Sequence, residues 1–269
     1  MRKDIKRFLG SAYYWLTLLG IDPLRTIGFM RGLPPYLCDL KTLKKQTRNA
    51  VKEFPLGKAY PCLEDRFSGC GLANGHYFHQ DLLVARRIHI NTPATHVDVG
   101  SRVDGFIAHV ASFRPIEVID IRPLSSHIPN VKFLQADFMS PIHNDLVDYC
   151  DSLSCLHAIE HFGLGRYGDP VNYDGYLLGL SNLYHVLKNG GKFYFATPIG
   201  PQRIEFNAHR VFSVRYLLEL FDGKYQVDQF SYVDDHGALH ENVPLLANDV
   251  DANFGCVYGC GIFELTKLC

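Results

Sequence analysis

The stretch THVDVGSRVDG, residues 95–105, decides the fold of this chain. Its apolar residues up to Val99 predict a buried strand, and the acid-x-Gly sequence from Asp98 to Gly100 predicts a tight turn that leads into a helix. Farther along, the run IEVIDIR places Asp120 at the end of another strand, twenty residues after Gly100. An acid at that distance from a glycine turn is typical of one that binds a ribose hydroxyl, so the two segments predict a site for a nucleotide-type cofactor.

Strand and helix patterns alternate after this point, which predicts an α/β fold with a mostly parallel sheet. A helix over residues 76–90 precedes the first strand, and the segment GYLLGLSNLYHVLKNGG predicts a helix that continues through Lys188 and stops at Gly190. The run KFYFATPI predicts a fifth strand, and Ser213 is expected to cap a helix over VRYLLELF. The runs YQVDQFSYV and CVYGCGIFELT predict an antiparallel pair at one edge. The other expected elements are strands over 95–100, 116–122, 131–136 and 147–155 and a helix over 105–113.

Length and composition set the domain organisation. The chain has 269 residues, 47% of them hydrophobic, which is enough to bury a substantial core. We expect one Rossmann-like domain over residues 75–269, preceded by an N-terminal extension of short helices and loops over residues 1–74, in which Pro34 and Pro35 act as turn-formers. The formal net charge of −1 provides no global field that would recruit nucleic acid.

The eight cysteines include no C-x-x-C pair, and several lie in apolar, strand-like runs. This usage is typical of reduced thiols in a cytoplasmic protein, and the cysteine spacing predicts no metal site. At the N-terminus, MRKDIKR precedes the apolar run FLGSAYYWLTLLG, which at about 13 residues is short of the roughly 20 needed to span a bilayer. We expect an amphipathic or buried helix, with peripheral membrane contact through Tyr13, Tyr14 and Trp15 as the alternative.

Five local strings, in order, give the chain a specific resemblance. They are the acid-x-Gly turn at Asp98, the strand-end Asp120, the pair Asp137-Phe138, the string SCLHAIEHF, and LKNGG followed by KFYFATP. The chain resembles class I S-adenosylmethionine-dependent methyltransferases over about residues 75–266. This implies a seven-stranded, mostly parallel sheet with an antiparallel C-terminal pair. Strings such as HVDVGSRVDGFIAHV and GPQRIEFNAHRVFS also look like a methyltransferase-like family of unknown function met among glycan-assembly proteins.

The resemblance implies a site for S-adenosyl-L-methionine at the strand ends. Asp120 would accept the ribose hydroxyls, Asp137 the adenine amine with Phe138 packed on the ring, and Asp98 the methionine ammonium, directly or through water. Gly100 would let the backbone approach the cofactor, and Gly105 would let the helix pack tightly on the strand. The full set of expected cofactor-binding residues is Asp98, Gly100, Ser101, Arg102, Gly105, Asp120, Ile121, Asp137 and Phe138.

Arg102 is the main departure, since such enzymes have a second glycine there. Its side chain would either enter the cofactor site, where it would pair with the methionine carboxylate, or turn away and pair with Asp104. If it blocks the site, the chain is a non-catalytic binding or assembly module that retains the fold. This alternative stays open from the sequence alone.

The string HAIEHFGLGRYGDP is the densest set of reactive side chains. It follows the fourth strand, where the transferred methyl would lie, and His157 or His161 would take the proton of a hydroxyl acceptor. The expected catalytic residues are His157, Glu160, His161 and Arg166. The same string contains H-x-x-E-H, which in a helix is the pattern of an inverted zinc protease, so a metal-dependent hydrolase is a third possibility. The resemblance implies a small-molecule, sugar or glycan-precursor acceptor, while the sequence leaves the acceptor, the methylated atom and the oligomeric state open.

Overall fold

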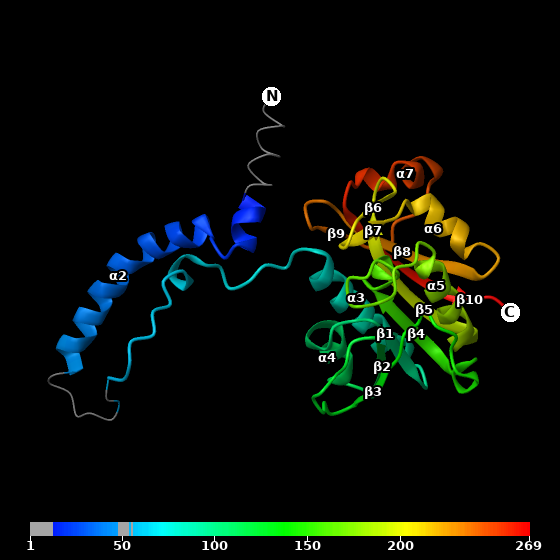
Figure 1. Ribbon diagram of the computed structural model, residues 1–269, viewed down its shortest axis with the longest axis horizontal. Helices are drawn as coiled ribbons and strands as arrows, with labels where there is room; N and C mark the ends of the chain where they lie inside the picture. Colours follow the sequence, from blue (N-terminus) through cyan, green and yellow to red (C-terminus); the bar gives the residue numbers. More distant parts are fainter. Residues whose placement is uncertain (1–12, 48–53, 55) are drawn as a thin grey trace. The chain divides into compact units, whose positions relative to one another are not determined.

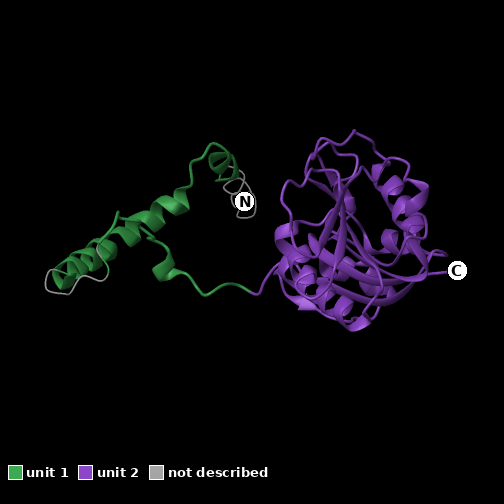
Figure 2. Cartoon of the chain, turned by 90° about the horizontal axis from the view of Figure 1, so that it is seen from below, with its two compact units in different colours: residues 1–72 green, residues 73–269 purple. Residues whose placement is uncertain are grey.

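The computed structural model describes residues 13–47, 54 and 56–269, and the chain divides into two compact units, residues 1–72 and 73–269 (Figure 2). In the first unit residues 13–18 are helical, helix α2 spans Pro23–Thr47, and a 3-10 turn, η1, spans Asp65–Phe67. Residues 13–18 belong to the apolar run for which a helix was predicted, and the part of that prediction before residue 13 lies outside the described residues. No helix in the described part of the chain is long and apolar enough to cross a membrane.

Helix α2 is the first departure from the sequence-based prediction of short helices and loops. Pro34 and Pro35 lie inside this helix of 25 residues instead of ending it. A proline removes one helical hydrogen bond and crowds the preceding turn, but it does not always stop a helix. Leucines lie on both sides of the pair, and three lysines follow it; both residue types favour helix, so the helix continues past both prolines.

The second unit is built on one sheet of eight strands in the order β3-β2-β1-β4-β5-β10-β8-β9 (Figure 1). Strands β1 to β5 pair in parallel, and β10 lies antiparallel between β5 and β8. The predicted mostly parallel sheet with an antiparallel C-terminal pair is confirmed, and the short β9 at the edge is an addition. The strands are β1 His96–Val99, β2 Ile116–Asp120, β3 Val131–Gln135, β4 Cys150–Leu156, β5 Leu187–Ile199, β8 Tyr225–Val233, β9 Leu239–His240 and β10 Gly259–Lys267.

Helices cover both faces of the sheet and give the unit three layers. Strand β5 illustrates the reason for this cover: its side chains alternate between two apolar clusters, one on each face of the sheet. Phe193 and Phe195 pack in the cluster that includes α5 (Gly175–Val186) and α6 (Val214–Phe221), while Tyr194 and Ala196 pack in the cluster that includes α3 (His76–Asn91). The wide helical turn η2 (Val103–Ile107) and α4 (Ala108–Ala111) join the α3 side. The helix predicted over 105–113 therefore begins and ends two residues earlier.

The boundary between α5 and β5 corrects a second prediction. The helix ends at Val186, and β5 begins at Leu187, so Lys188 and Gly190 belong to a strand instead of a last helical turn. Leu187 pairs with Cys150 of β4, and this extra ladder contact extends β5 backwards along the chain. The helical period in the sequence could not reveal a pairing partner that lies 37 residues away.

The segment after β5 contains a small hairpin that the sequence did not indicate. Strands β6 (Arg203–Glu205) and β7 (His209–Val211) pair antiparallel outside the main sheet. The prediction that Ser213 caps α6 is confirmed, because its side chain accepts a hydrogen bond from the amide of Tyr216. The remaining elements are η3 Asn144–Leu146, η4 Ile159–His161, α7 Ala247–Asp251 and η5 Asn253–Gly255.

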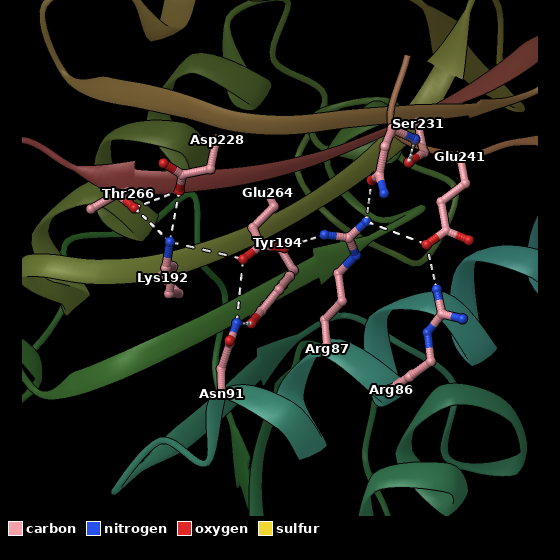
Figure 3. Close-up of polar contacts among 11 residues, drawn as sticks. Arg86, Arg87, Asn91, Lys192, Tyr194, Asp228, Ser231, Glu241, Glu264 and Thr266 are labelled. Carbon is pink, nitrogen blue, oxygen red and sulfur yellow. Dashed lines mark hydrogen bonds and ion pairs between the residues drawn. The ribbon is translucent and has the colours of Figure 1, made fainter. Parts of the chain in front are cut away.

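Polar contacts fix helix α3 against strands β5 and β10 (Figure 3). Arg87 forms an ion pair of 2.7 Å with Glu264, and the side chains are only 12% and 10% exposed. Asn91 donates to the hydroxyl of Tyr194 at 2.6 Å, which ties the end of the helix to the centre of β5. These contacts hold α3 in place, and with it the histidine and tyrosine at its N-terminus, His76 and Tyr77.

Candidate functional site

A cleft opens where the parallel strands β1, β2, β3 and β4 end. This edge is where ligands of open α/β sheets bind. Of the cofactor-binding residues expected from the sequence, five line the cleft: Gly100, Asp120, Ile121, Asp137 and Phe138. The other lining residues are Val99, Ile119, Arg122, Ala136, Met139, His157, Ala158, His161, Phe162, Tyr167 and Asp169.

Gly100 forms the floor of the cleft between β1 and the loop after β4. Its φ angle is +85°, a left-handed conformation that glycine adopts without strain. A Cβ atom placed on Gly100 would lie 2.6 Å from the Cβ of Ala158, which is much too close. Both the backbone angle and the close approach therefore require glycine at this position.

Asp120 ends β2 with its carboxylate facing Arg122. The carboxylate accepts from the backbone amide of Arg122 at 2.8 Å and from its Nε at 2.9 Å, and a second guanidinium nitrogen contacts the other oxygen. The Arg122 guanidinium also lies 4.7 Å above the ring of Tyr167. Sequence reasoning missed Arg122, although its position two residues after the strand-end acid was a usable signal. Each carboxylate oxygen has two lone pairs, so Asp120 keeps acceptor capacity towards the cleft.

Asp137 and Phe138 follow β3 and form the next part of the wall. Asp137 accepts from the amide of Met139 at 2.8 Å, which turns the chain back across the cleft. Phe138 is 3% exposed, and its carbonyl accepts from the side chain of Asn182 at 2.7 Å. The pair thus places a carboxylate next to a buried aromatic ring in the wall of the cleft.

Asp98 lies behind the cleft and not in its lining. It is fully buried, and its carboxyl group contacts the amide and hydroxyl of Ser101 at 3.0 and 2.9 Å and the hydroxyl of Ser154. Burial raises the pKa of Asp98 to about 7. His96, which bonds to Ser152 and Ser154, has its pKa lowered to about 3 by burial. This network stabilises the backbone of the Gly100 turn from within.

Arg102 and Gly105 also lie away from the cleft. The Arg102 guanidinium donates to the carboxylate of Asp104 at 2.9 and 2.6 Å, and its side chain is 69% exposed. It therefore does not block the cleft, which removes the observation that favoured a non-catalytic module. A Cβ atom on Gly105 would lie 2.9 Å from Oδ2 of Asp81, so this glycine admits helix α3 rather than tightening the contact with β1.

The loop after β4 brings three of the four expected catalytic residues together. Nδ1 of His157 lies 2.7 Å from Oε1 of Glu160, and the two side chains are 4% and 1% exposed. Burial lowers the pKa of His157, but Cys260 and Glu160 outweigh it and raise that pKa well above its ordinary value. Burial lowers the pKa of His161, whose Nδ1 lies 2.6 Å from the carbonyl of Ala208. Both histidines line the cleft.

Arg166 and the helical zinc pattern are not found at the cleft. The Arg166 guanidinium donates to the carbonyl of Ala208 at 2.9 Å, and the residue is not among the lining side chains. The H-x-x-E-H pattern needs a helix over all five residues, but only Ile159–His161 form a 3-10 turn. His157 has a φ angle of +50°, outside any right-handed helix. The inverted zinc-protease arrangement is therefore not formed.

The strand order, the Gly100 turn and the strand-end acids define a class I methyltransferase fold. Comparison with solved structures finds chains of similar fold. The [4+2]-cyclase SpnF superposes with a TM-score of 0.51 at 14% identity, covering 76% of this chain and 90% of that one. The N-methyltransferase NodS from Bradyrhizobium japonicum WM9, in complex with S-adenosyl-l-homocysteine, gives a TM-score of 0.47 at 10% identity, covering 72% and 88%. At these identities the likeness establishes the fold alone.

Sequence comparison gives one partial match. A family model described as "Caenorhabditis protein of unknown function, DUF268" matches residues 125–246, which is less than half of the chain. The matched region runs from the loop before β3 to the start of α7, so it includes the loop after β4 but not the Gly100 turn. No curated protein matches the sequence.

Proposed function

We propose that the chain is an S-adenosylmethionine-dependent methyltransferase. The observation that carries the proposal is the joint placement of Gly100, Asp120, Asp137 and Phe138 around one cleft at the strand ends. These residues fit the cofactor, because Asp120 retains acceptor capacity for ribose hydroxyls and Asp137 lies beside an aromatic wall for adenine. The absence of a side chain at Gly100 leaves room for the amino-acid portion. When bound, the cofactor supplies an electrophilic methyl group on a sulfonium.

His161 is the residue that we propose as the base. Its Nδ1 donates to the Ala208 carbonyl, which leaves Nε2 with the lone pair. The lowered pKa keeps the ring neutral at pH 7, so Nε2 is able to accept the proton of a hydroxyl acceptor as the methyl group transfers. Much of the rate enhancement would also come from holding the acceptor in line with the sulfonium.

For the acceptor, we propose a neutral, hydroxyl-bearing small molecule such as a sugar or glycan precursor. A second hollow lies beside the cleft and is lined by Tyr173, Tyr176, Gln202, Arg203, Ile204, Arg210, Val211, Phe212 and Tyr216. Arg210, which lines it, donates to the carbonyl of Phe162 in the cofactor cleft at 2.6 Å. Arg203 and Arg210 direct their donors to backbone carbonyls and Glu205, and the hydroxyls of Tyr176 and Tyr216 bond to each other. The hydroxyl of Tyr173 and the amide nitrogen of Gln202, whose oxygen accepts from Ser213, remain for a ligand. Aromatic faces with a few polar groups suit a neutral ring better than an anion.

The direct test is transfer of a labelled methyl group. Full-length protein would be incubated with methyl-labelled S-adenosylmethionine and fractionated small-molecule and glycan extracts. We expect labelling of a neutral, hydroxyl-bearing fraction, loss of labelling in Asp120→Ala, and retention in Asp145→Ala, which removes an exposed acid outside the cleft. Equal labelling by both variants, or no labelled fraction with well-folded protein, would contradict the proposal.

The compartment and other partners follow from composition. We propose a cytoplasmic enzyme, because its cysteine usage is typical of reduced thiols. We also propose that it does not act on nucleic acid, because the formal net charge is −1. The aromatic residues of the N-terminal extension support a peripheral membrane contact. Their exposed side chains include Tyr14 and Trp15, which are 59% and 62% exposed.

A further inference from the structure

Three side chains from distant parts of the sequence converge beside the cofactor cleft. His76 begins helix α3, His157 follows β4, and Cys260 is the second residue of β10. One donor atom of each lies within 4.8 Å of the donor atoms of the other two. Among the residues that the structure describes, this is the one such group of three or more histidine, cysteine or acidic side chains. His157 also lines the cleft, so the cluster borders the candidate active site.

The second observation is an unpartnered nitrogen aimed into this cluster. Nδ1 of His157 is held by Glu160 at 2.7 Å, which leaves Nε2 as the free nitrogen of the ring. The side chain of His157 is only 4% exposed, and its buried Nε2 has no hydrogen-bond partner. A buried polar atom without a partner is destabilising, so a ligand for this atom is favoured. A carboxylate that holds one imidazole nitrogen while the other faces a metal is a recurrent arrangement in metalloproteins.

The surroundings keep the other two donors available. Cys260 is fully buried, and its sulfur has only long contacts of 3.9 Å, to Gln80 and to the backbone of Gly261. The ring of His76 stacks on that of His157 with centroids 5.2 Å apart. Tyr258 and Tyr77 pack against His76 and His157 at 5.3 and 5.0 Å, which walls the cluster with aromatic rings.

We propose that His76, His157 and Cys260 bind a zinc-type divalent ion. Two imidazoles and one thiolate form the nitrogen and sulfur donor set that zinc prefers. Bonds of about 2.0–2.3 Å would bring the donor atoms to within roughly 3.3–3.8 Å of one another, so the side chains close slightly around the ion. Three protein ligands leave a fourth position for water or another ligand, as in zinc sites that act on substrates.

The main experiment measures the metal content of untagged full-length protein after dialysis against zinc and then against metal-free buffer. We expect about one zinc per chain, falling at least tenfold in Cys260→Ala and unchanged in Cys256→Ala. Cys256 is the matched control because it is a buried cysteine that lies three residues before β10 and outside the cluster. Equal zinc in both variants, or no zinc in folded wild-type protein, would overturn the proposal.

A spectroscopic measurement on the wild-type protein tests thiolate ligation even if a variant fails to fold. Cobalt added to the wild-type protein is expected to give a thiolate-to-metal charge-transfer band, and its absence would refute thiolate ligation. In Glu160→Gln the band would remain, but metal affinity would fall about 10–100-fold, because the amide orients His157 less strongly. An unchanged affinity would exclude the positioning role of Glu160. These measurements require no cofactor, so zinc binding would stand even if S-adenosylmethionine binding failed.

Discussion

At the scale of single residues, Gly100 determines whether the cleft forms. Alanine there would place a side chain in a left-handed backbone and 2.6 Å from Ala158. We expect Gly100→Ala to lower the free energy of unfolding by about 2–5 kcal/mol, because the backbone cost of about 1–2 kcal/mol is added to the steric clash. Gly223 has a similar φ of +67° but no atom near its Cβ position, so Gly223→Ala should lose the backbone cost alone. Urea denaturation distinguishes the two, and equal losses would argue against the close approach.

Asp98 gives the protein a specific pH dependence of stability. Folding raises the pKa of Asp98 from 3.8 to about 7 through burial. Between those values the folded state holds a proton that the unfolded state releases, so the free energy of unfolding falls as pH rises, by at most about 4 kcal/mol. Asp98→Asn has no titrating group there, and the difference between the two proteins should change with pH over this window. If the free energies of unfolding of variant and wild type, measured by denaturation at each pH, differ by a constant amount, Asp98 does not titrate in this range.

The residues also show which parts of the site a sequence can reveal. Gly100, Asp120, Asp137 and Phe138 were predictable because each lies at a fixed place after a strand, and strand ends meet at one edge. The direction in which a side chain points cannot be predicted in this way. Asp98 turns behind the cleft towards Ser101 and Ser154, and Arg102 turns outwards to Asp104. The cluster of His76, His157 and Cys260 could not be predicted from the sequence, since His157 lies 81 positions after His76 and Cys260 lies 103 positions after His157.

At the scale of elements, two neighbouring arginines of α3 should contribute very differently. Arg87 pairs with Glu264 where both side chains are nearly buried, whereas Arg86 pairs with Glu241 with its side chain 55% exposed. Arg87→Ala should lower the free energy of unfolding by about 3 kcal/mol, because it leaves Glu264 without its main partner. Arg86→Ala should cost less than about 1 kcal/mol, as is usual for exposed pairs. Similar losses in thermal denaturation would mean that the contacts in Figure 3 do not fix α3.

Elements with strong local periodicity were predicted well, while boundaries set by distant partners were not. Helix α3 and helix α6 follow from their own apolar spacing and, for α6, from the cap at Ser213. The start of β5 depends on the pairing of Leu187 with Cys150, and the hairpin of β6 and β7 depends on pairing across a short turn. Such tertiary pairing overrides local propensity and leaves little trace in a single sequence.

At the scale of the whole molecule, the second unit holds a complete core. All buried members of both apolar clusters lie between Leu83 and Leu265, within residues 73–269. We therefore expect a fragment of residues 73–269 to fold by itself and to unfold in one cooperative transition. Circular dichroism during heating measures this. A fragment with a broad, non-cooperative transition would show that the N-terminal 72 residues complete the fold.

Binding of S-adenosylhomocysteine, measured by titration calorimetry, tests most directly whether the cleft is a cofactor site. Full-length protein should bind with a dissociation constant between about 1 µM and 1 mM, a range typical of enzyme ligands. Asp120→Asn should weaken binding about 10–100-fold through loss of a charged acceptor, while Asp145→Asn, at an exposed acid outside the cleft, should bind like the wild type. No binding by well-folded protein at millimolar ligand, or equal affinities for the two variants, would contradict the proposed function.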